Sequence, residues 1–259
     1  PQVAAHATAG SFVHVAVDPS IPMRRPLSIM RANRAAGWIE LLYKIHGHGL
    51  LHLASRRAGD TVNLLGPIGQ GFRPDPARPR SLLLGGGVGI PPMLFLAETL
   101  RNRAAEGFRP FALLGSELPF PFTTRPSTMM VPGMPDGVIA CMPLLEEWGV
   151  PSRLTSKSGF PGVYDGFVTD LARLWLAQLE PAALAQVTVF TCGPTPMLKA
   201  VAALAREFAL PCQVSLEEYM VCAVGGCAGC AVEVRTPQGV AMKRVCVDGP
   251  VFDAATVFR

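Results

Sequence analysis

The chain has 259 residues, of which 49% are hydrophobic and 16% are charged, and its formal net charge is only +4. This composition predicts a globular protein of one or two domains and excludes an intrinsically disordered chain. No nucleic-acid partner is expected because basic residues form no long run, and no membrane partner is expected because no apolar run is long enough to cross a bilayer and no leader opens the sequence.

Short strands separated by Gly and Pro dominate the first 75 residues. Residues 11–17 alternate in the two-residue rhythm of a strand, and strand-like runs follow at residues 24–29, 38–45 and 61–65. A short helix is expected at residues 50–54. Short strands with this punctuation predict a small antiparallel β-barrel, to which we assign residues 1–75.

The pattern changes after the Pro- and Arg-rich residues 73–80, which we interpret as a linker between domains. Apolar strands are predicted at residues 81–84, 111–114, 137–141 and 187–191, and helices at residues 91–103 and 197–208. Strands that alternate with helices predict a parallel sheet covered by helices on both faces. This predicted α/β domain spans residues 76–212, and residues 119–137 form a long loop within it to which we assign no chemistry.

Two turns of the predicted sheet domain have the composition of a nucleotide-binding site. In GGGVG, residues 85–89, a strand passes into a helix, so that backbone N–H groups can face a diphosphate. Ile90 stands where a G-x-G-x-x-G motif would have its third Gly, and a tight turn that only packs a helix on a sheet is the alternative. TCGPTPM, residues 191–197, ends a later strand, and two such loops at the carboxyl edge of one sheet would flank a ligand crevice. The residues expected at a nucleotide are Gly85, Gly86, Gly87, Gly89, Cys192, Gly193 and Pro194.

RPLS, residues 25–28, is a candidate flavin-binding motif. Its Arg offers a guanidinium to a phosphate and its Ser offers a hydroxyl to a flavin ring. An ordinary strand with one exposed Arg is the competing interpretation. Gly49 and Leu50, at the start of the predicted short helix, could supply N–H groups to a diphosphate.

Four Cys residues form the most specific motif of the sequence. Cys222, Cys227 and Cys230 are spaced C-x4-C-x2-C, and Cys246 follows after 15 intervening residues. Four thiolates so arranged can hold a [2Fe–2S] cluster, and the Gly residues between them let the loop wrap closely around it. A structural zinc site and unrelated buried thiols are the alternatives. The other three of the seven Cys residues are expected as reduced thiols, which suits a cytoplasmic protein.

With RPLS, GGGVGIPPM, TCGPTPM and the Cys motif in this order, the chain resembles the ferredoxin-reductase superfamily. Within it, the chain is most similar to the iron–sulfur electron-transfer subunits of class 1B dihydroorotate dehydrogenases, and the likeness covers nearly the whole sequence, including YDGFVTDL at residues 164–171 and CVDGPVF at residues 246–252. The resemblance implies an α/β plus all-β protein: an antiparallel flavin-binding β-barrel, a Rossmann-like parallel-sheet domain that binds NAD, and a small C-terminal [2Fe–2S] cluster domain at residues 213–259.

The resemblance also implies which residues bind the cofactors. FAD would be held by Arg25, Pro26, Leu27, Ser28, Leu42, Tyr43, Lys44, Gly49 and Leu50, and the cluster by Cys222, Cys227, Cys230 and Cys246. The family often has Thr where Leu50 stands, so one phosphate hydrogen bond is missing here. The family's first barrel strand lies upstream of residues 1–15; we therefore expect a truncated N-terminus, the alternative being a barrel with an open edge at residues 11–17.

The function implied by the resemblance is an electron relay in pyrimidine (UMP) biosynthesis. Two electrons would leave dihydroorotate at an FMN in a separate catalytic subunit, cross the cluster one at a time, collect on FAD and leave as hydride to NAD. This predicts an oxidoreductase subunit that acts on dihydroorotate only with its FMN-containing partner, in a heterotetramer of two plus two. No catalytic acid or base is expected, because the transfers need none and the five His residues are scattered.

Two other functions remain as alternatives. The same module could serve a sulfide, ferredoxin or hydrogenase partner, or the chain could be a regulatory or metal-storage protein with zinc at the Cys site. NAD is preferred over NADP because Glu117, which follows the strand at residues 111–114, could accept from ribose hydroxyls, whereas Arg125 leaves NADP open. Exposed apolar residues near the cluster loop, such as Met220 and Val224, are candidates for the surface that meets the partner.

Overall fold

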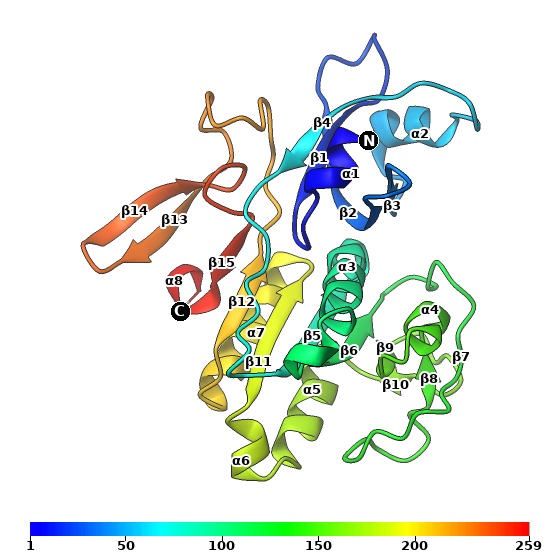
Figure 1. Cartoon of the computed structure of the whole chain (residues 1–259), viewed down its shortest axis with the longest axis vertical. Helices are drawn as coiled ribbons and strands as arrows, with labels where there is room; N and C mark the ends of the chain where they lie inside the picture. The colour runs from blue at the N-terminus through cyan, green and yellow to red at the C-terminus, as the bar shows by residue number, and fades with distance from the viewer. Residues whose placement is uncertain (259) are drawn as a thin grey trace.

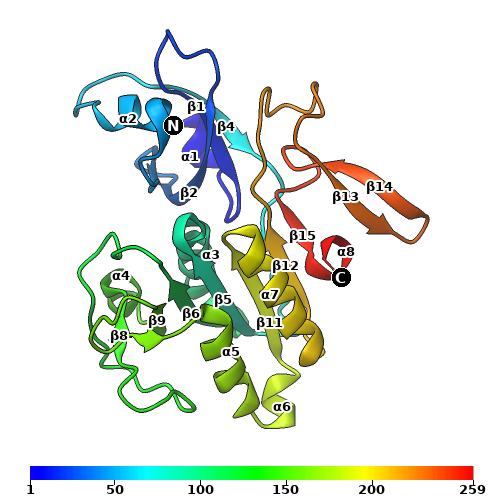
Figure 2. The same ribbon diagram turned by 180° about the vertical axis from the view of Figure 1, so that it is seen from behind.

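The computed structural model describes residues 1–258, and its main parts are an antiparallel sheet, a larger mixed sheet and a C-terminal hairpin. Figure 1 shows the antiparallel sheet at one end of the molecule, the large sheet at the other and the hairpin projecting from one side; Figure 2 shows the same arrangement from behind. Arg259, the last residue of the predicted cluster domain, lies outside the described residues. No helix in the described part of the chain is long and apolar enough to span a bilayer.

The antiparallel sheet has the strand order β3-β2-β1-β4. Its strands are β1 (Phe12–Ala16), β2 (Arg25–Asn33), β3 (Trp38–Leu41) and β4 (Asn63–Ile68), and the helices α1 (Gln2–His6) and α2 (Gly47–Ala54) accompany them. Because β1 pairs with β2 on one side and with β4 on the other, the alternative of an open edge at residues 11–17 is not found. The strand expected at residues 38–45 ends at Leu41, and the helix expected at residues 50–54 begins at Gly47.

Alternation along β1 directs its side chains into two different cores. Val13 and Val15 are buried together with Leu27 and Ile29 of β2. Phe12, on the opposite face of β1, is buried in a core that it shares with the C-terminal part of the chain. The antiparallel sheet is therefore packed on both faces rather than standing apart as an independent unit.

The large sheet has the order β10-β9-β6-β5-β11-β12-β15, and all its strands are parallel except β15. The strands are β5 (Arg80–Gly86), β6 (Arg109–Gly115), β9 (Ser152–Ser156), β10 (Tyr164–Asp165), β11 (Val187–Cys192), β12 (Cys212–Ser215) and β15 (Val251–Asp253). From β5 the chain builds outward through β6 and β9, then returns to add β11 on the other side of β5. The topological switch point, where such sheets bind ligands, thus lies between β5 and β11.

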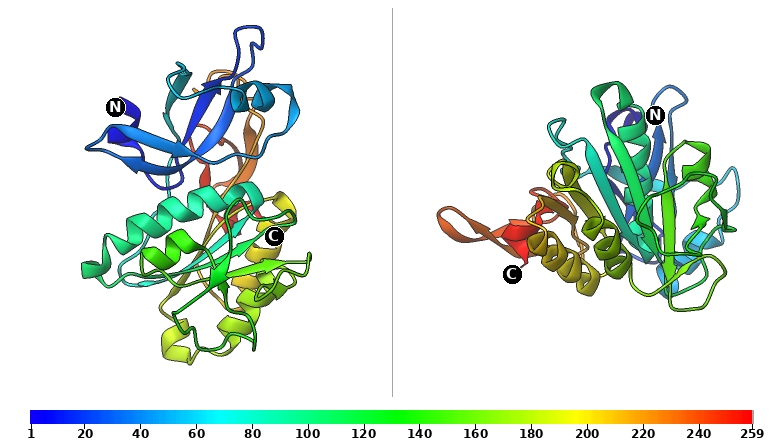
Figure 3. Two further views of the ribbon diagram at one scale, coloured as in Figure 1. Left: turned by 90° about the vertical axis from the view of Figure 1, so that its right-hand side faces the viewer. Right: turned by 90° about the horizontal axis from the view of Figure 1, so that it is seen from below.

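Helices cover both faces of the large sheet. Its long helices are α3 (Ile90–Arg101), α5 (Val168–Ala177) and α7 (Thr195–Glu207), and the shorter ones are η1 (Gly87–Gly89), η2 (Ala104–Glu106), α4 (Pro143–Glu147) and α6 (Pro181–Leu184). Alternate residues of β5 separate the faces: Leu83 is buried with α3, whereas Leu82 and Leu84 are buried with α5 and α7. Figure 3 shows α3 between the two sheets, and α3 packs directly against β2.

The segment between β6 and β9 differs from its prediction. The strand expected at residues 137–141 is reduced to β8 (Ala140–Cys141), which pairs with β7 (Arg125–Pro126) and not with the large sheet. The buried Arg153 of β9 secures this segment by donating to the carbonyls of Val138 (3.1 Å) and Met129 (2.7 Å). A polar side chain inside the sheet therefore holds the long loop in place.

The C-terminal part of the chain leaves the large sheet and returns to it. The hairpin strands are β13 (Ala231–Thr236) and β14 (Gly239–Arg244), and α8 (Ala254–Val257) ends the fold. β15 adds an antiparallel strand beside β12. β12 begins at Cys212, the last residue of the predicted α/β domain, and continues into the predicted cluster domain, which begins at residue 213. The four Cys residues of the motif lie in the two loops that flank the hairpin.

Candidate functional site

Arg25 and the first turn of α2 meet beside the antiparallel sheet. A Cβ atom added at Gly49 would lie 3.1 Å from both Nε and Nη2 of Arg25, so the guanidinium lies directly against the helix N-terminus. A guanidinium and the N–H groups of a first helical turn both favour anions. The structure therefore brings together Arg25, Gly49 and Leu50, three of the residues expected at FAD.

The hydrogen bonds of Arg25 leave part of its guanidinium free. Nη1 donates to the carbonyls of Met23 (2.7 Å) and Arg24 (3.3 Å), whereas Nε and Nη2 donate to no residue within the described chain. The neighbouring Arg24 is used differently: its Nη2 donates to Oδ1 of Asn63 (2.6 Å) and its Nη1 to the carbonyl of His14 (3.1 Å). Arg25 can bind a phosphate, and Arg24 ties strands together.

The other residues expected at FAD differ in what they can offer. Along β2, Leu27 is buried in the apolar core, so only its backbone can face a ligand, while Pro26 and Ser28 are partly exposed. The segment that follows β3 contains Leu42, Tyr43 and Lys44, of which the first two are partly exposed and the last is exposed. The donor set fits a flavin nucleotide, and the individual contacts stay a prediction.

The two Gly-rich loops interlock at the switch point of the large sheet. Cys192 ends β11 in register with Gly85 of β5. A Cβ atom at Gly89 would overlap the carbonyl of Cys192, and one at Gly193 would lie 3.3 Å from the backbone N of Gly86. These Gly residues allow two backbones to touch, which brings both expected nucleotide loops together at the carboxyl edge of the sheet.

Within the first loop, residues 85–89, different Gly residues are required for different physical reasons. A Cβ at Gly85 would come within 3.0 Å of Leu114 and 3.1 Å of Met93, so Gly85 serves packing. Gly87 has φ +53 and nothing within 4 Å of a Cβ, so its backbone faces open space. Gly85 therefore fits the packing interpretation of this turn, and Gly87 is a residue of the turn whose backbone is open to a ligand.

Glu217 lies beside the nucleotide loops, although the sequence assigned it no role. It follows β12, whose last residue, Ser215, is in register with Cys192. Burial raises the pKa of the Cys192 thiol, and the Glu217 carboxylate raises it further. Desolvation by the surrounding protein also raises the pKa of Glu217 itself, although its side chain is exposed to solvent. The proximity of Glu217 to Cys192 follows from the pairing of β11 with β12, which the sequence alone does not show.

The four Cys residues of the motif converge as two pairs. The backbone N–H of Cys227 donates to Sγ of Cys222 (3.4 Å), and Cys246 lies close enough to Cys230 for the second thiol to raise the pKa of the first, after burial, to about 11. Within residues 1–258, no three His, Cys, Asp or Glu side chains are grouped closely enough to hold one metal ion. Because Cys222 also contributes to the raised pKa of Cys246, the two pairs lie near each other, and four thiolates are the ligand set of a [2Fe–2S] cluster.

The backbone of the Cys loop provides positive groups to these thiolates. Ala223 (φ +56) and Ala228 (φ +53) both adopt the left-handed conformation directly after a Cys. Successive N–H groups in such turns form concave sites for anions. Accordingly, the N–H groups of Val224 and Cys227 lower the pKa of Cys222 to about 6. The loop fits a cluster ligated by thiolates.

The exposed apolar residues near this loop are partly those expected. Val224 is 63% exposed, but Met220 is only 6% exposed, so its assignment to a partner surface is wrong. Met220 packs into the core that contains Phe12 of β1. Tyr219 (93% exposed) and Val221 (57% exposed) are the exposed residues instead.

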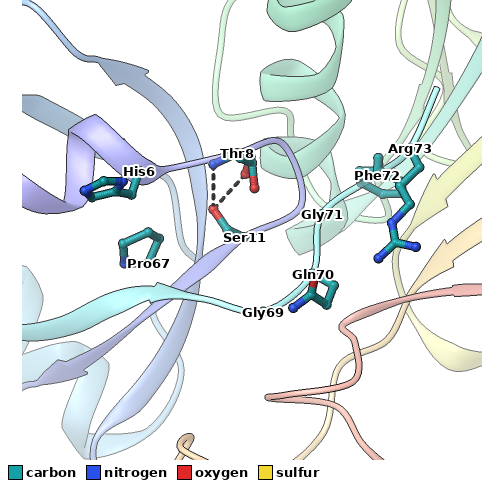
Figure 4. A pocket seen from close by; sticks show the side chains of 9 residues that line it. All are labelled: His6, Thr8, Ser11, Pro67, Gly69, Gln70, Gly71, Phe72 and Arg73. Carbon is teal, nitrogen blue, oxygen red and sulfur yellow. Dashed lines mark hydrogen bonds between the residues drawn. The ribbon is translucent and has the colours of Figure 1, made fainter.

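One cavity of the described chain is lined in part by Ser11, whose carbonyl accepts from the backbone N of Ile29 next to the RPLS motif (Figure 4). Its volume is about 490 Å³, and it lies between the loop after α1 and the segment that follows β4. Thr8 and Ser11 on its wall bond to each other, with Ser11 Oγ donating to the carbonyl of Thr8 (2.7 Å). A smaller cavity, of about 260 Å³, is lined in part by Arg125.

Comparison with known proteins gives a consistent result. Residues 217–258 match the family model described as the iron-sulfur cluster binding domain of dihydroorotate dehydrogenase B. The dihydroorotate dehydrogenase B (NAD(+)) electron transfer subunit of Bacillus caldolyticus is 36% identical over 255 residues, covering 96% of this chain and 86% of the relative. The subunit of the same name from Shouchella clausii is 33% identical over 257 residues, covering 96% and 85%.

Solved structures show the same architecture. A structure of NADH-dependent reduced ferredoxin-NADP oxidoreductase, described for flavin-based electron bifurcation, superimposes with a TM-score of 0.78 at 28% identity, over 99% of this chain and 82% of the other. The cytochrome b5 reductase domain of Ulva prolifera nitrate reductase superimposes with a TM-score of 0.58 at 19% identity, over 79% and 82%. The second likeness concerns the fold alone.

Proposed function

The chain belongs to the family of dihydroorotate dehydrogenase B (NAD⁺) electron transfer subunits, and on this premise we propose how its residues carry electrons from a catalytic partner subunit to NAD. It is an oxidoreductase subunit of pyrimidine biosynthesis with FAD, a [2Fe–2S] cluster and NAD as its cofactors. The partner contains FMN, and the two kinds of subunit assemble as two plus two.

One observation supports the order cluster, FAD, NAD: β2, the strand that begins with RPLS, lies between the other two sites. On one side β2 packs against α3, the helix that begins at the Gly-rich turn. On the other side Ser28 is in register with Phe12 of β1, and the Phe12 side chain shares a core with Cys230 and Cys246. A group bound along β2 would thus lie next to the helix of the Gly-rich turn and one strand away from the core that contains Cys230 and Cys246.

The residues of the chain position the cofactors and need no acid or base. When bound, FAD exchanges single electrons with the cluster and a hydride with NAD, which is the chemistry that the cluster and the nicotinamide cannot do with each other. Arg25 and the first turn of α2 hold the flavin diphosphate. Gly87 presents its backbone to the NAD diphosphate, and Glu117, which follows β6, accepts from the ribose and favours NAD over NADP.

The partner subunit docks over the exposed part of the Cys loop. Tyr219, Val221 and Val224 form an apolar surface around Cys222, and Cys227 is itself exposed. Apolar and aromatic side chains at the centre of a surface are typical of protein interfaces. Docking there brings the partner's flavin close to the cluster.

The experiment is NADH formation from dihydroorotate and NAD, measured with the complex of chain and partner and with the chain alone. Turnover only in the complex supports the function. A Cys227→Ser complex should lose this turnover and keep its FAD, because the flavin site lies on other elements. Dihydroorotate turnover that persists in this variant contradicts the relay, and a flavin-containing complex that ignores dihydroorotate indicates another partner for the same module.

A further inference from the structure

Arg244 connects the hairpin to the loop that supplies the first three Cys residues. It is the last residue of β14, and its Nη1 donates to the carbonyl of Gly225 (3.0 Å). Gly225 lies between Cys222 and Cys227 and has φ +82, a conformation that favours Gly. The guanidinium therefore lies against the tip of the Cys loop.

Asp248 holds this guanidinium in place. Its Oδ2 lies 3.7 Å from Nε of Arg244 and also accepts from the backbone N of Arg244 (2.8 Å). Arg244 and Asp248 stand two residues before and two residues after Cys246. The pair thus ties the segment of the fourth Cys to the loop of the first three.

We propose that Arg244 is a positioning residue of the iron–sulfur site, which fixes the two Cys segments against each other and raises the reduction potential of the bound cluster through its positive charge. This inference rests on the proposed cluster site. On reduction the cluster accepts one electron from the catalytic partner and becomes more negative by one charge. A guanidinium stays protonated at any working pH, and a nearby cation stabilises the more negative state.

Asp248 works against this charge effect. Its carboxylate disfavours the added electron while it orients Arg244. Replacing Arg244 by Gln should consequently lower the midpoint potential, and replacing Asp248 by Asn, which can still accept from the Arg244 backbone, should raise it. Opposite shifts from two touching residues distinguish an electrostatic role from general loosening of the loop.

Lys243 offers a matched control. Its Nζ lies 4.0 Å from Oδ1 of Asp248, so it pairs with the same carboxylate from the same strand. It makes no hydrogen bond to the Cys loop within the described residues, and its side chain is about as exposed as that of Arg244 (41% and 42%). Lys243→Gln removes the same formal charge but leaves the hydrogen bond from Arg244 to the carbonyl of Gly225 in place.

The test is an EPR-monitored redox titration of the cluster in the purified complex, together with its iron content. For Arg244→Gln we expect the reduced cluster to be disfavoured by up to about tenfold, which is 59 mV for a one-electron couple. Arg244→Lys should have a midpoint potential close to that of the wild type, because the positive charge is kept. It should bind iron less firmly, because an ammonium lacks the planar, multiple donors with which a guanidinium connects the two Cys segments. Lys243→Gln should match the wild type in both measurements.

Three outcomes overturn the proposal. A wild-type potential and iron content in Arg244→Gln exclude both roles of the residue. Equal shifts in Arg244→Gln and Lys243→Gln reduce the effect to surface charge. If Arg244→Gln is isolated without iron, Asp248→Asn decides: a raised potential supports the charge effect and an unchanged one refutes it. A wild-type complex without any [2Fe–2S] signal refutes the proposed function itself, which is a different result.

Discussion

The two neighbouring residues Arg24 and Arg25 should fail in opposite ways when each is replaced by Gln. Nε and Nη2 of Arg25 bond to no residue of the described chain and lie against the first turn of α2. Each hydrogen bond to a charged group contributes about 1.5–3 kcal/mol, and since Arg25 is partly exposed we count one such bond. Arg25→Gln should therefore weaken FAD binding by about 10- to 100-fold.

Arg24→Gln should leave FAD bound but destabilise the fold. It removes the bond to Asn63 (2.6 Å) and that to the carbonyl of His14 (3.1 Å), a loss of about 1 kcal/mol, or about 2–4 °C in Tm for a chain of this size. The assay is the fluorescence of FAD released on dilution, with Tm measured in parallel. Wild-type FAD affinity in Arg25→Gln, or equal FAD loss in both variants, would refute a direct phosphate contact.

Three further predictions test the other parts of the molecule. Gly89→Ala should lower Tm more than Gly87→Ala, because the added methyl overlaps the Cys192 carbonyl, whereas at Gly87 it costs the fold only the left-handed backbone, about 1 kcal/mol. Gly87→Ala should instead weaken NADH binding, measured by NADH-dependent flavin reduction, because the methyl occupies the open space proposed for the NAD diphosphate; an unchanged NADH affinity would contradict this. Burial, followed by the charge of Arg24, lowers the pKa of His14 below its usual 6.5. As pH falls below about 6.5, the unfolded chain takes up a proton on His14 before the folded chain does, so the stability of the fold should decrease. His14→Phe should flatten this part of the Tm–pH curve, and an unchanged slope would be evidence against this role of His14. Hydrogen bonds to Glu146 outweigh burial and lower its pKa to about 2. Its contribution to stability should therefore be present above about pH 4.5 and be lost as pH falls towards 2. Glu146→Gln should reduce this loss of stability at acid pH when Tm is measured against pH.

Local patterns predicted the parts of the sites that consist of a few consecutive residues. The Cys spacing and the Gly-rich turn are visible in the sequence because thiolate ligation and close backbone contact each require a particular residue type. The helix that follows the turn was also predicted, at residues 91–103, and the structure places it at Ile90–Arg101. Such features depend on neighbours along the chain.

Features that depend on distant neighbours were missed. β9 reads SRLTS and has no apolar pattern, yet all five residues are buried. It is tolerated because its polar groups find partners, since Ser152 Oγ accepts from the backbone N of Met142 (3.1 Å) and Arg153 donates to three carbonyls. β15 was missed for a related reason, because three residues become a strand only where β12 offers its edge.

The burial of the Cys residues gives the proposed relay a direction. Cys230 and Cys246, each 3% exposed, share a core with Phe12, one strand away from RPLS, whereas Cys227 is exposed and Cys222 is intermediate. In a bound cluster, the buried pair would lie on the side of this core and the exposed pair on the side of the proposed docking surface. This asymmetry would let the exposed side of the site receive electrons and the buried side pass them towards the core. Met220 is buried in the same core, which leaves Tyr219 and Val221 on either side of it as the exposed residues.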